Sequence, residues 1–223
     1  MKMHTKRIAS GYGKGKKWVT TPNPGPHTRG RSIPLLIVVR DVLGYADSSR
    51  EAKRIIHGGL VLVDKKLRRD PKFGVGLMDI LEFQRLKKYF RVMPAKNGLI
   101  LKEISEKESK VKLCKIINKS VIKKGITQLS LHDGSSILTE KEDYNTKDSL
   151  VLELPDRKIN DALKFVKGNT ALVVKGRHSG KAEKIKDISK GTATRKSITS
   201  LGDIQTLTDY LFVIGRDKSL IQI

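Results

Sequence analysis

The stretch SSREAKRIIHGGLVLV, residues 48–63, limits the fold more than any other part of this chain. Ser48 and Glu51 have the Ser-x-x-Glu spacing of a capping box, in which each side chain bonds a backbone N–H at the start of a helix. Gly58 provides the glycine with which helices commonly end, and the apolar run after it is typical of a strand. We therefore expect a short helix followed directly by a strand over residues 60–63.

Positive charge gathers on one side of this predicted helix. At about 100° per residue, positions i, i+3, i+4 and i+7 fall within a sector of roughly 100°. The basic residues at these positions are Arg50, Lys53, Arg54 and His57. Ala52, Ile55 and Ile56 occupy the opposite side. Because like charges at these spacings repel each other, we expect this face to bind an anion; the alternative is an ordinary solvated face.

The segment after the strand adds further positive charge. Its acidic residues are Asp64 and Asp70, and its basic residues are Lys65, Lys66, Arg68 and Arg69. If the strand packs beside the helix, the helix face and this turn form one continuous basic surface. Such a surface contacts phosphates and recognises the shape of a nucleic acid more than its sequence.

The whole chain is also strongly positive. Its 46 Lys and Arg residues outnumber 23 Asp and Glu residues, for a formal net charge of +23, which a polyanionic partner would neutralise. Residues 1–95 hold the denser charge, net +14. Nucleic acid is the expected partner. An anionic membrane surface is an alternative, but the apolar runs are too short to span a bilayer, so we expect no membrane partner.

The N-terminal 31 residues form a basic arm. They contain eight Lys or Arg residues and no acid, and they have too little apolar area to order by themselves. We expect the arm to order on RNA through Lys6, Arg7, Lys14, Lys16, Lys17, Arg29 and Arg31. Tyr12 and Trp18 either stack on unpaired bases or pin the arm to the protein's own surface.

Residues 32–88 are predicted to form a helix-helix-hairpin unit. A first helix begins near Pro34, a favourable first-turn residue, and stops at Gly44. The capped helix follows, and strands over residues 60–63 and 75–83 complete the unit.

Two β-rich segments follow this unit. Residues 89–158 read as a central β domain, with a hairpin turn at Asp133 and Gly134. Residues 159–223 contain short strands with glycine at the turns, which is typical of a small barrel. The expected fold is therefore α+β with several domains.

The reactive residues indicate a protein that is not an enzyme. The five histidines lack metal-ligand spacing: His4, His27, His57, His132 and His178. Cys114 lies in an alternating strand pattern and reads as a buried thiol, not a nucleophile. A single cysteine also suits a reducing, cytoplasmic compartment. We expect no cofactor, no metal and no small-molecule substrate.

Several motifs of the chain, taken together, resemble those of a known family. The helix, GGLVLVD, the basic turn and MDIL resemble the S-four RNA-binding module of ribosomal proteins and RNA-modifying enzymes. Four further motifs occur in the order expected of one family: GPHTRGRSIPLLIVVRDVLGYA, KGITQLSLHDG, GNTALVVKGRHSGK and FVIG. With them, nearly the whole chain resembles the archaeal and eukaryotic family of small-subunit ribosomal protein four, e type. The chain stops soon after FVIG, without the basic C-terminal extension of eukaryotic members, which favours an archaeal one.

The resemblance implies a structural protein of the small ribosomal subunit. It implies rRNA and neighbouring ribosomal proteins as partners, with one copy of the chain in the ribosome. It also implies that the C-terminal segment is a KOW module on an SH3-like barrel. The KOW pattern carries over to Gly168, Gly176, Gly180, Ala171, Val173 and Ile185. Glu183 stands where the family commonly has a further glycine, which puts a tight turn there in doubt.

Four further RNA-binding candidates cluster in one predicted turn of this module. They are Lys175, Arg177, His178 and Lys181. The glycines around them let the backbone approach a phosphate closely. The alternatives are contact with a protein or plain solvation.

The sequence leaves two alternative functions open. One is an RNA-modifying enzyme, for example of pseudouridine synthase type, with an S-four module as its substrate handle. It would need a catalytic domain, whereas the later residues read as β-rich binding domains. The other is a transcription-associated KOW factor, which residues 1–95 do not support.

Overall fold

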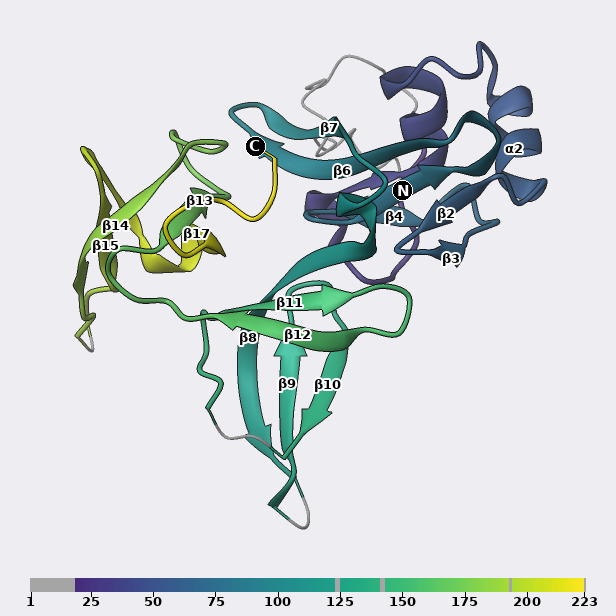
Figure 1. The fold of residues 1–223 in the computed structure, drawn as a ribbon. Coiled ribbons are helices and arrows are strands. Elements are labelled where there is room, and N and C mark those ends of the chain that lie inside the picture. The colour runs from purple at the N-terminus through teal and green to yellow at the C-terminus, as the bar shows by residue number, and fades with distance from the viewer. Residues whose placement is uncertain (1–18, 123–124, 141–142, 193, 223) are drawn as a thin grey trace. The chain divides into compact units, whose positions relative to one another are not determined.

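The computed structural model describes residues 19–122, 125–140, 143–192 and 194–222. The described chain consists mostly of strands in several sheets, with a few short helices (Figure 1). It divides into two compact units. The first unit comprises Met1–Met93, Asn97–Lys112 and Leu154–Asp156, and the second comprises Pro94–Lys96, Leu113–Glu153 and Arg157–Ile223. This is the α+β organisation with several sheets that the sequence predicts.

The first unit packs two short helices against antiparallel strands. Its helices are α1 (Leu35–Ile37) and α2 (Ser49–His57). Its strands are β1 (Ser32–Pro34), β2 (Val61–Val63), β3 (Lys66–Leu67), β4 (Gly74–Gly76), β5 (Ile80–Phe83), β6 (Lys88–Ala95) and β7 (Gly98–Ile104). Five of these strands form a sheet in the order β3-β2-β5-β6-β7, and β1 pairs with β4.

The expected first helix is present but irregular. Pro34 is the N-cap of α1, and after Ile37 the chain continues as a π-helical turn over Val38–Val42. Gly44 has a left-handed backbone (φ +65°), which ends the helical segment as predicted. The residues from Leu35 to Val39 are all buried, so this segment lies within the core on every side.

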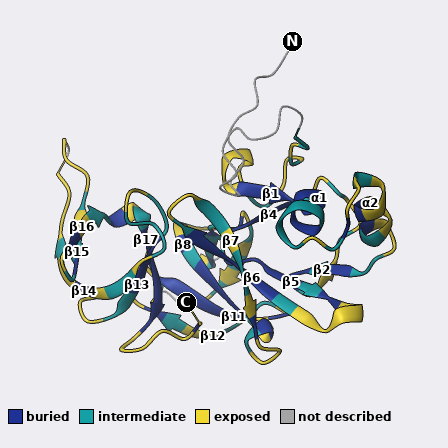
Figure 2. Cartoon of the chain, turned by 90° about the horizontal axis from the view of Figure 1, so that it is seen from above, coloured by how far each residue is buried: buried dark blue, intermediate teal, exposed yellow. Residues whose placement is uncertain are grey.

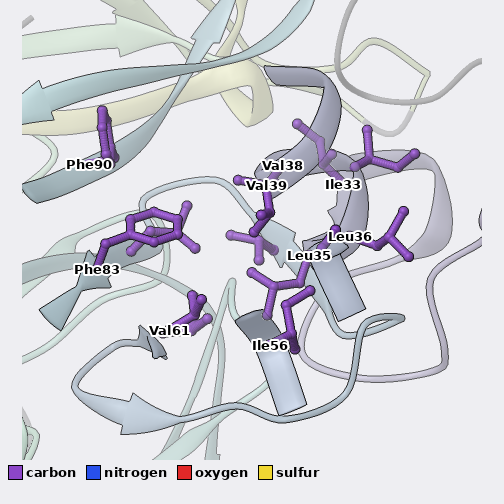
Figure 3. Close-up of a cluster of buried hydrophobic side chains, with 14 of the residues drawn as sticks. Ile33, Leu35, Leu36, Val38, Val39, Ile56, Val61, Phe83 and Phe90 are labelled. Atoms are coloured by element: carbon purple, nitrogen blue, oxygen red, sulfur yellow. The ribbon is translucent and has the colours of Figure 1, made fainter. Parts of the chain in front are cut away.

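One hydrophobic cluster holds the first unit together. Ile56 of α2 and Val61 of β2 pack with α1 and with Phe83 and Phe90 of the sheet (Figure 3). Phe83 meets Tyr45 and Phe90 edge to face, with centroids 5.1 and 6.0 Å apart. Burying a side chain such as Ile56 contributes about 1.5–3 kcal/mol. The cluster fixes the inner side of α2 and thereby decides which side faces outward.

Two five-stranded sheets make up the second unit. Their strands are β8 (Val111–Val121), β9 (Thr127–Leu131), β10 (Ser136–Thr139), β11 (Ser149–Glu153), β12 (Lys158–Leu163), β13 (Thr170–Val173), β14 (Ala182–Ser189), β15 (Ile198–Leu201), β16 (Ile204–Leu207) and β17 (Leu211–Gly215). The orders are β10-β9-β8-β11-β12 and β16-β15-β14-β13-β17. The predicted hairpin at Asp133 and Gly134 joins β9 to β10, and Cys114 is fully buried in the first of these sheets.

One detail of the sequence prediction needs correction. Residues 75–83 do not form one strand region: β4 pairs with β1, β5 pairs with β2, and Met78 between them has a left-handed backbone (φ +63°). β6 pairs with β5 from Lys88 onward.

Candidate nucleic-acid interface

The backbone around α2 places its charged face as the sequence predicts. Ser48 Oγ accepts the Glu51 backbone N–H at 3.2 Å, and Glu51 Oε2 accepts the Ser48 N–H at 3.4 Å, which completes the capping box. Such a cap is worth about 1 kcal/mol. Gly58 is the C-cap of α2, as predicted, with a right-handed backbone, and the left-handed residue that follows is Gly59 (φ +72°).

The helix α2 has an exposed side (Figure 2), and its four cations belong to the exposed residues. All four are exposed: Arg50, Lys53, Arg54 and His57. Ala52 and Ile56 on the opposite side are fully buried. Glu51, the acid within this turn of helix, directs its carboxylate to the N-cap and so is used locally. We call these four residues the α2 face.

The basic turn after β2 contributes less free charge than the sequence predicts. Asp64 and Lys65 have left-handed backbones and form the two-residue loop between β2 and β3. Lys65 Nζ lies 2.6 Å from Glu82 Oε2 and 5.0 Å from the centre of the Tyr89 ring. Arg68 stacks on Phe73 at 4.4 Å. Both cations thus have partners within the protein.

Lys66 and Arg69 are the exposed basic residues of that turn. Arg29 and Arg31 are also exposed, in a short 3-10 turn that precedes β1. The remaining candidates of the arm, and the two aromatic residues proposed to stack or pin it, lie outside the described residues: Lys6, Arg7, Lys14, Lys16, Lys17, Tyr12 and Trp18.

The second unit carries the other predicted basic turn, between β13 and β14. Gly176 and Gly180 have left-handed backbones (φ +90° and +91°). Arg177 and Lys181 are exposed, His178 is half-buried, and Lys175 Nζ lies 5.5 Å from the centre of the Tyr210 ring.

The apolar positions of the predicted KOW pattern are buried next to this turn. Ala171, Val173 and Ile185 belong to one core cluster. Glu183 lies within β14 opposite Ala171, so the chain continues as a strand at the position where the family commonly has glycine.

Two basic residues that contribute to the net charge are buried in the first unit. Lys112 is 1% exposed, and its Nζ lies 2.5 Å from Asp64 Oδ2 and 2.7 Å from Asp79 Oδ1. Asp79 Oδ2 also lies 2.8 Å from His27 Nε2 and accepts the Gly76 N–H. These four side chains form a buried ionic cluster that sequence analysis missed, because its members are far apart along the chain.

Burial and charge set the pKa values in this cluster. Burial alone would raise the pKa of Asp79, but Lys112 and His27 outweigh it and hold that pKa below the ordinary value. Burial, together with the Asp79 charge, raises the pKa of Asp64. Arg91, 1% exposed, bonds the carbonyls of Glu108 and Val111, and burial lowers its pKa. These cations stabilise the core and are not presented to a partner.

Within the described ranges, no three His, Cys, Asp or Glu side chains group as a metal site would require. Over the same residues, no helix is long and apolar enough to cross a membrane.

A capped basic helix packed on a small antiparallel sheet is the arrangement of an S4 domain, and the family model described as "S4 domain" matches residues 33–81. The model described as "Ribosomal family S4e" matches residues 86–159. The relatives below extend the similarity to nearly the whole chain, and the chain belongs to the ribosomal S4e family.

Three relatives illustrate this similarity. The small ribosomal subunit protein eS4 of Methanothermobacter thermautotrophicus is 42% identical over 234 residues, covering 99% of this chain and 95% of the relative. The eS4 protein of Methanosphaera stadtmanae is 44% identical over 216 residues, covering 94% and 89%. The crystal structure of the 30S ribosomal protein S4e from Thermoplasma acidophilum has a TM-score of 0.77 and 31% identity, covering 86% of this chain and 99% of that one.

Proposed function

We propose that this chain is a structural constituent of the small ribosomal subunit that binds rRNA and supports subunit assembly and translation in the cytoplasm. The observation that carries the proposal is the similarity to proteins named small ribosomal subunit protein eS4 over 94–99% of the chain. The S4 domain match and the exposed α2 face support RNA as the partner. Relatives from archaea support an archaeal member.

The proposed mode of binding is electrostatic. Phosphates of folded rRNA contact the α2 face, with Lys66 and Arg69 at its margin and Arg29 and Arg31 from the arm. Each phosphate neutralised releases counterions, so affinity falls steeply with salt. The buried side of α2 keeps the helix from turning and holds these cations in a fixed pattern. Phosphate contacts of this kind recognise RNA shape instead of base identity.

The finer assignments extend this proposal. We propose a basic arm over residues 1–31, an S4 module over residues 32–88, a central β domain over residues 89–158 and an SH3-like KOW barrel over residues 159–223. The turn with Arg177 and Lys181 is a further RNA contact in this scheme. The role is non-catalytic, with rRNA and neighbouring ribosomal proteins as partners and one copy of the chain in each subunit.

Sedimentation of the tagged chain in an extract of its own cells tests this function. At moderate salt, we expect the chain to co-migrate with small subunits at about one copy per subunit. Raising the salt should release it only when the subunits themselves begin to lose proteins. A chain that stays at the top of the gradient at moderate salt, while the subunits sediment intact, would overturn the proposal.

A further inference from the structure

The second unit contains a basic hollow outside the residues assigned above. Its volume is about 470 Å³, within the range of small-molecule pockets. The wall consists mainly of the loop between β14 and β15, joined by Lys147 from the loop before β11. The lining of the hollow includes Lys147, Lys190, Arg195, Lys196, Phe165 and Ile188.

The rim of this hollow is cationic. Lys190, Arg195 and Lys196 are exposed, and Lys147 Nζ lies 3.4 Å from Ser197 Oγ. Among the described residues, none of these four cations forms an ion pair, and Asp209 is the single acid of the lining. By contrast, Lys184 and Lys186 of β14 pair with Asp217 and Asp203, and Lys167 in the turn before β13 pairs with Asp187. Four cations without an ion-pair partner among the described residues thus line the hollow.

The floor is apolar and held in place. Phe165 and Ile188 are half-buried side chains that also pack against the core of this sheet. The buried Asp148 carboxylate accepts the Phe165 N–H at 2.7 Å and the Asn145 N–H at 2.9 Å. Asp148 therefore links the segment that contains Phe165 to the loop that carries Lys147. This link fixes the apolar floor and the cationic rim relative to each other.

The loop itself is also folded tightly. Thr192 N–H donates to the Arg195 carbonyl at 2.9 Å, and the Arg195 N–H donates to Thr192 Oγ1 at 3.3 Å. A Cβ on Gly191 would lie 2.7 Å from the Arg195 carbonyl oxygen, so only glycine fits this close approach. The cations at the rim are thus carried by a shaped loop.

We propose that this hollow binds one unstacked nucleotide of RNA. The base packs on Phe165 and Ile188, and the adjoining phosphates contact Lys190, Arg195 and Lys196. An apolar floor with an aromatic ring beside unpaired cations matches a base joined to phosphate, because every base has a π face and the backbone supplies the negative charge. An acidic peptide would use the rim and leave the aromatic floor without a role. This inference rests on the proposed function for its choice of RNA as partner.

The test uses the full chain and a 4-thiouridine tetranucleotide, which is too short to form a helix. After irradiation, mass spectrometry maps the crosslinked peptides. We expect crosslinks in the peptides that contain Phe165 or the β14–β15 loop. The triple variant Lys190→Gln, Arg195→Gln, Lys196→Gln should lower these crosslinks at least tenfold, since each lost phosphate contact on a single strand removes about 0.7 from the salt slope. Phe165→Leu should weaken them roughly fivefold through lost base stacking.

A matched control removes the same charge elsewhere on this unit. Lys167→Gln, Lys184→Gln, Lys186→Gln should leave the crosslinks at the hollow unchanged, because these lysines already have acidic partners. Crosslinks that avoid the hollow, or that the first triple variant does not reduce, would overturn the inference. The inference would also be overturned if polyglutamate of equal charge displaced the RNA and Phe165→Leu left the crosslinks unchanged. Loss of co-sedimentation with intact crosslinks at the hollow would instead overturn the ribosomal function alone.

Discussion

Lys112→Met is expected to lower the free energy of unfolding by about 3–5 kcal/mol, because removing one partner of a buried ion pair leaves its counter-charge uncompensated. Here two carboxylates, Asp64 and Asp79, lose the ammonium that lies 2.5 and 2.7 Å from them. Methionine fills a similar volume, so the loss is electrostatic and not a cavity effect. Urea unfolding followed by circular dichroism measures the change.

The pH dependence of this variant identifies the cause. Without Lys112, burial and the charge of Asp79 raise the pKa of Asp64 further, and Asp79 loses the main cation that holds its pKa down. A raised carboxyl pKa weakens folding at pH above it, and the penalty disappears as the pH falls through that value and the group takes up a proton. The stability deficit should therefore shrink as the pH is lowered from neutral toward the range in which carboxyl groups take up protons.

The exposed Lys110, two residues earlier, provides the control. Lys110→Met removes the same charge from the surface and should change the unfolding free energy by less than about 0.5 kcal/mol. A deficit in Lys112→Met that is as small as this, or one that does not change as the pH is lowered, would contradict the ionic cluster as described.

Arg50→Ala combined with Arg54→Ala is expected to weaken binding to small-subunit rRNA by roughly ten- to hundredfold near physiological salt, because about one unit of salt slope is lost for each phosphate contact. The slope of log affinity against log salt should flatten by about one to two units. Both side chains are exposed and on the side of α2 away from the core, so folding should be unaffected. Binding titrations at several salt concentrations measure both quantities.

Lys167→Ala combined with Lys184→Ala is the matched control for this experiment. It removes two positive charges from residues that already pair with Asp187 and Asp217. We expect the salt slope to stay within a few tenths of the parent value. If the two double variants give the same slope as the parent chain, the α2 face is only a solvated surface.

Local physics made α2 predictable from sequence. The capping box depends on residues three apart, and the division between a buried and a charged side depends on helical periodicity alone. The structure confirms both, at Ser48 with Glu51 and at Ile56 opposite the four cations. The turn at Asp133 and Gly134 was predictable for the same reason, since two residues determine it.

Pairings between distant residues were not predictable in this way. Residues 112–114 are all buried, and the partners of Lys112 come from positions 64 and 79, which no local sequence pattern connects to it. The sequence also gives no sign that Lys65 and Arg68 have partners within the protein. In the structure Lys65 contacts Glu82 and Tyr89, and Arg68 contacts Phe73. The sequence therefore overstates the charge that the turn after β2 offers to RNA, and it leaves the hollow next to Phe165 undetected.

Crosslinking from the α2 face inside purified small subunits is the most direct test of the central claim. Lys53 is replaced by a benzophenone amino acid, and Glu103, an exposed residue of β7, is replaced in a parallel control. After irradiation, we expect the probe at position 53 to crosslink to small-subunit rRNA and to do so far more than the probe at position 103. Crosslinks from position 53 to ribosomal proteins only, or no crosslinks in subunits that contain the chain, would contradict the assignment of the α2 face as the rRNA interface.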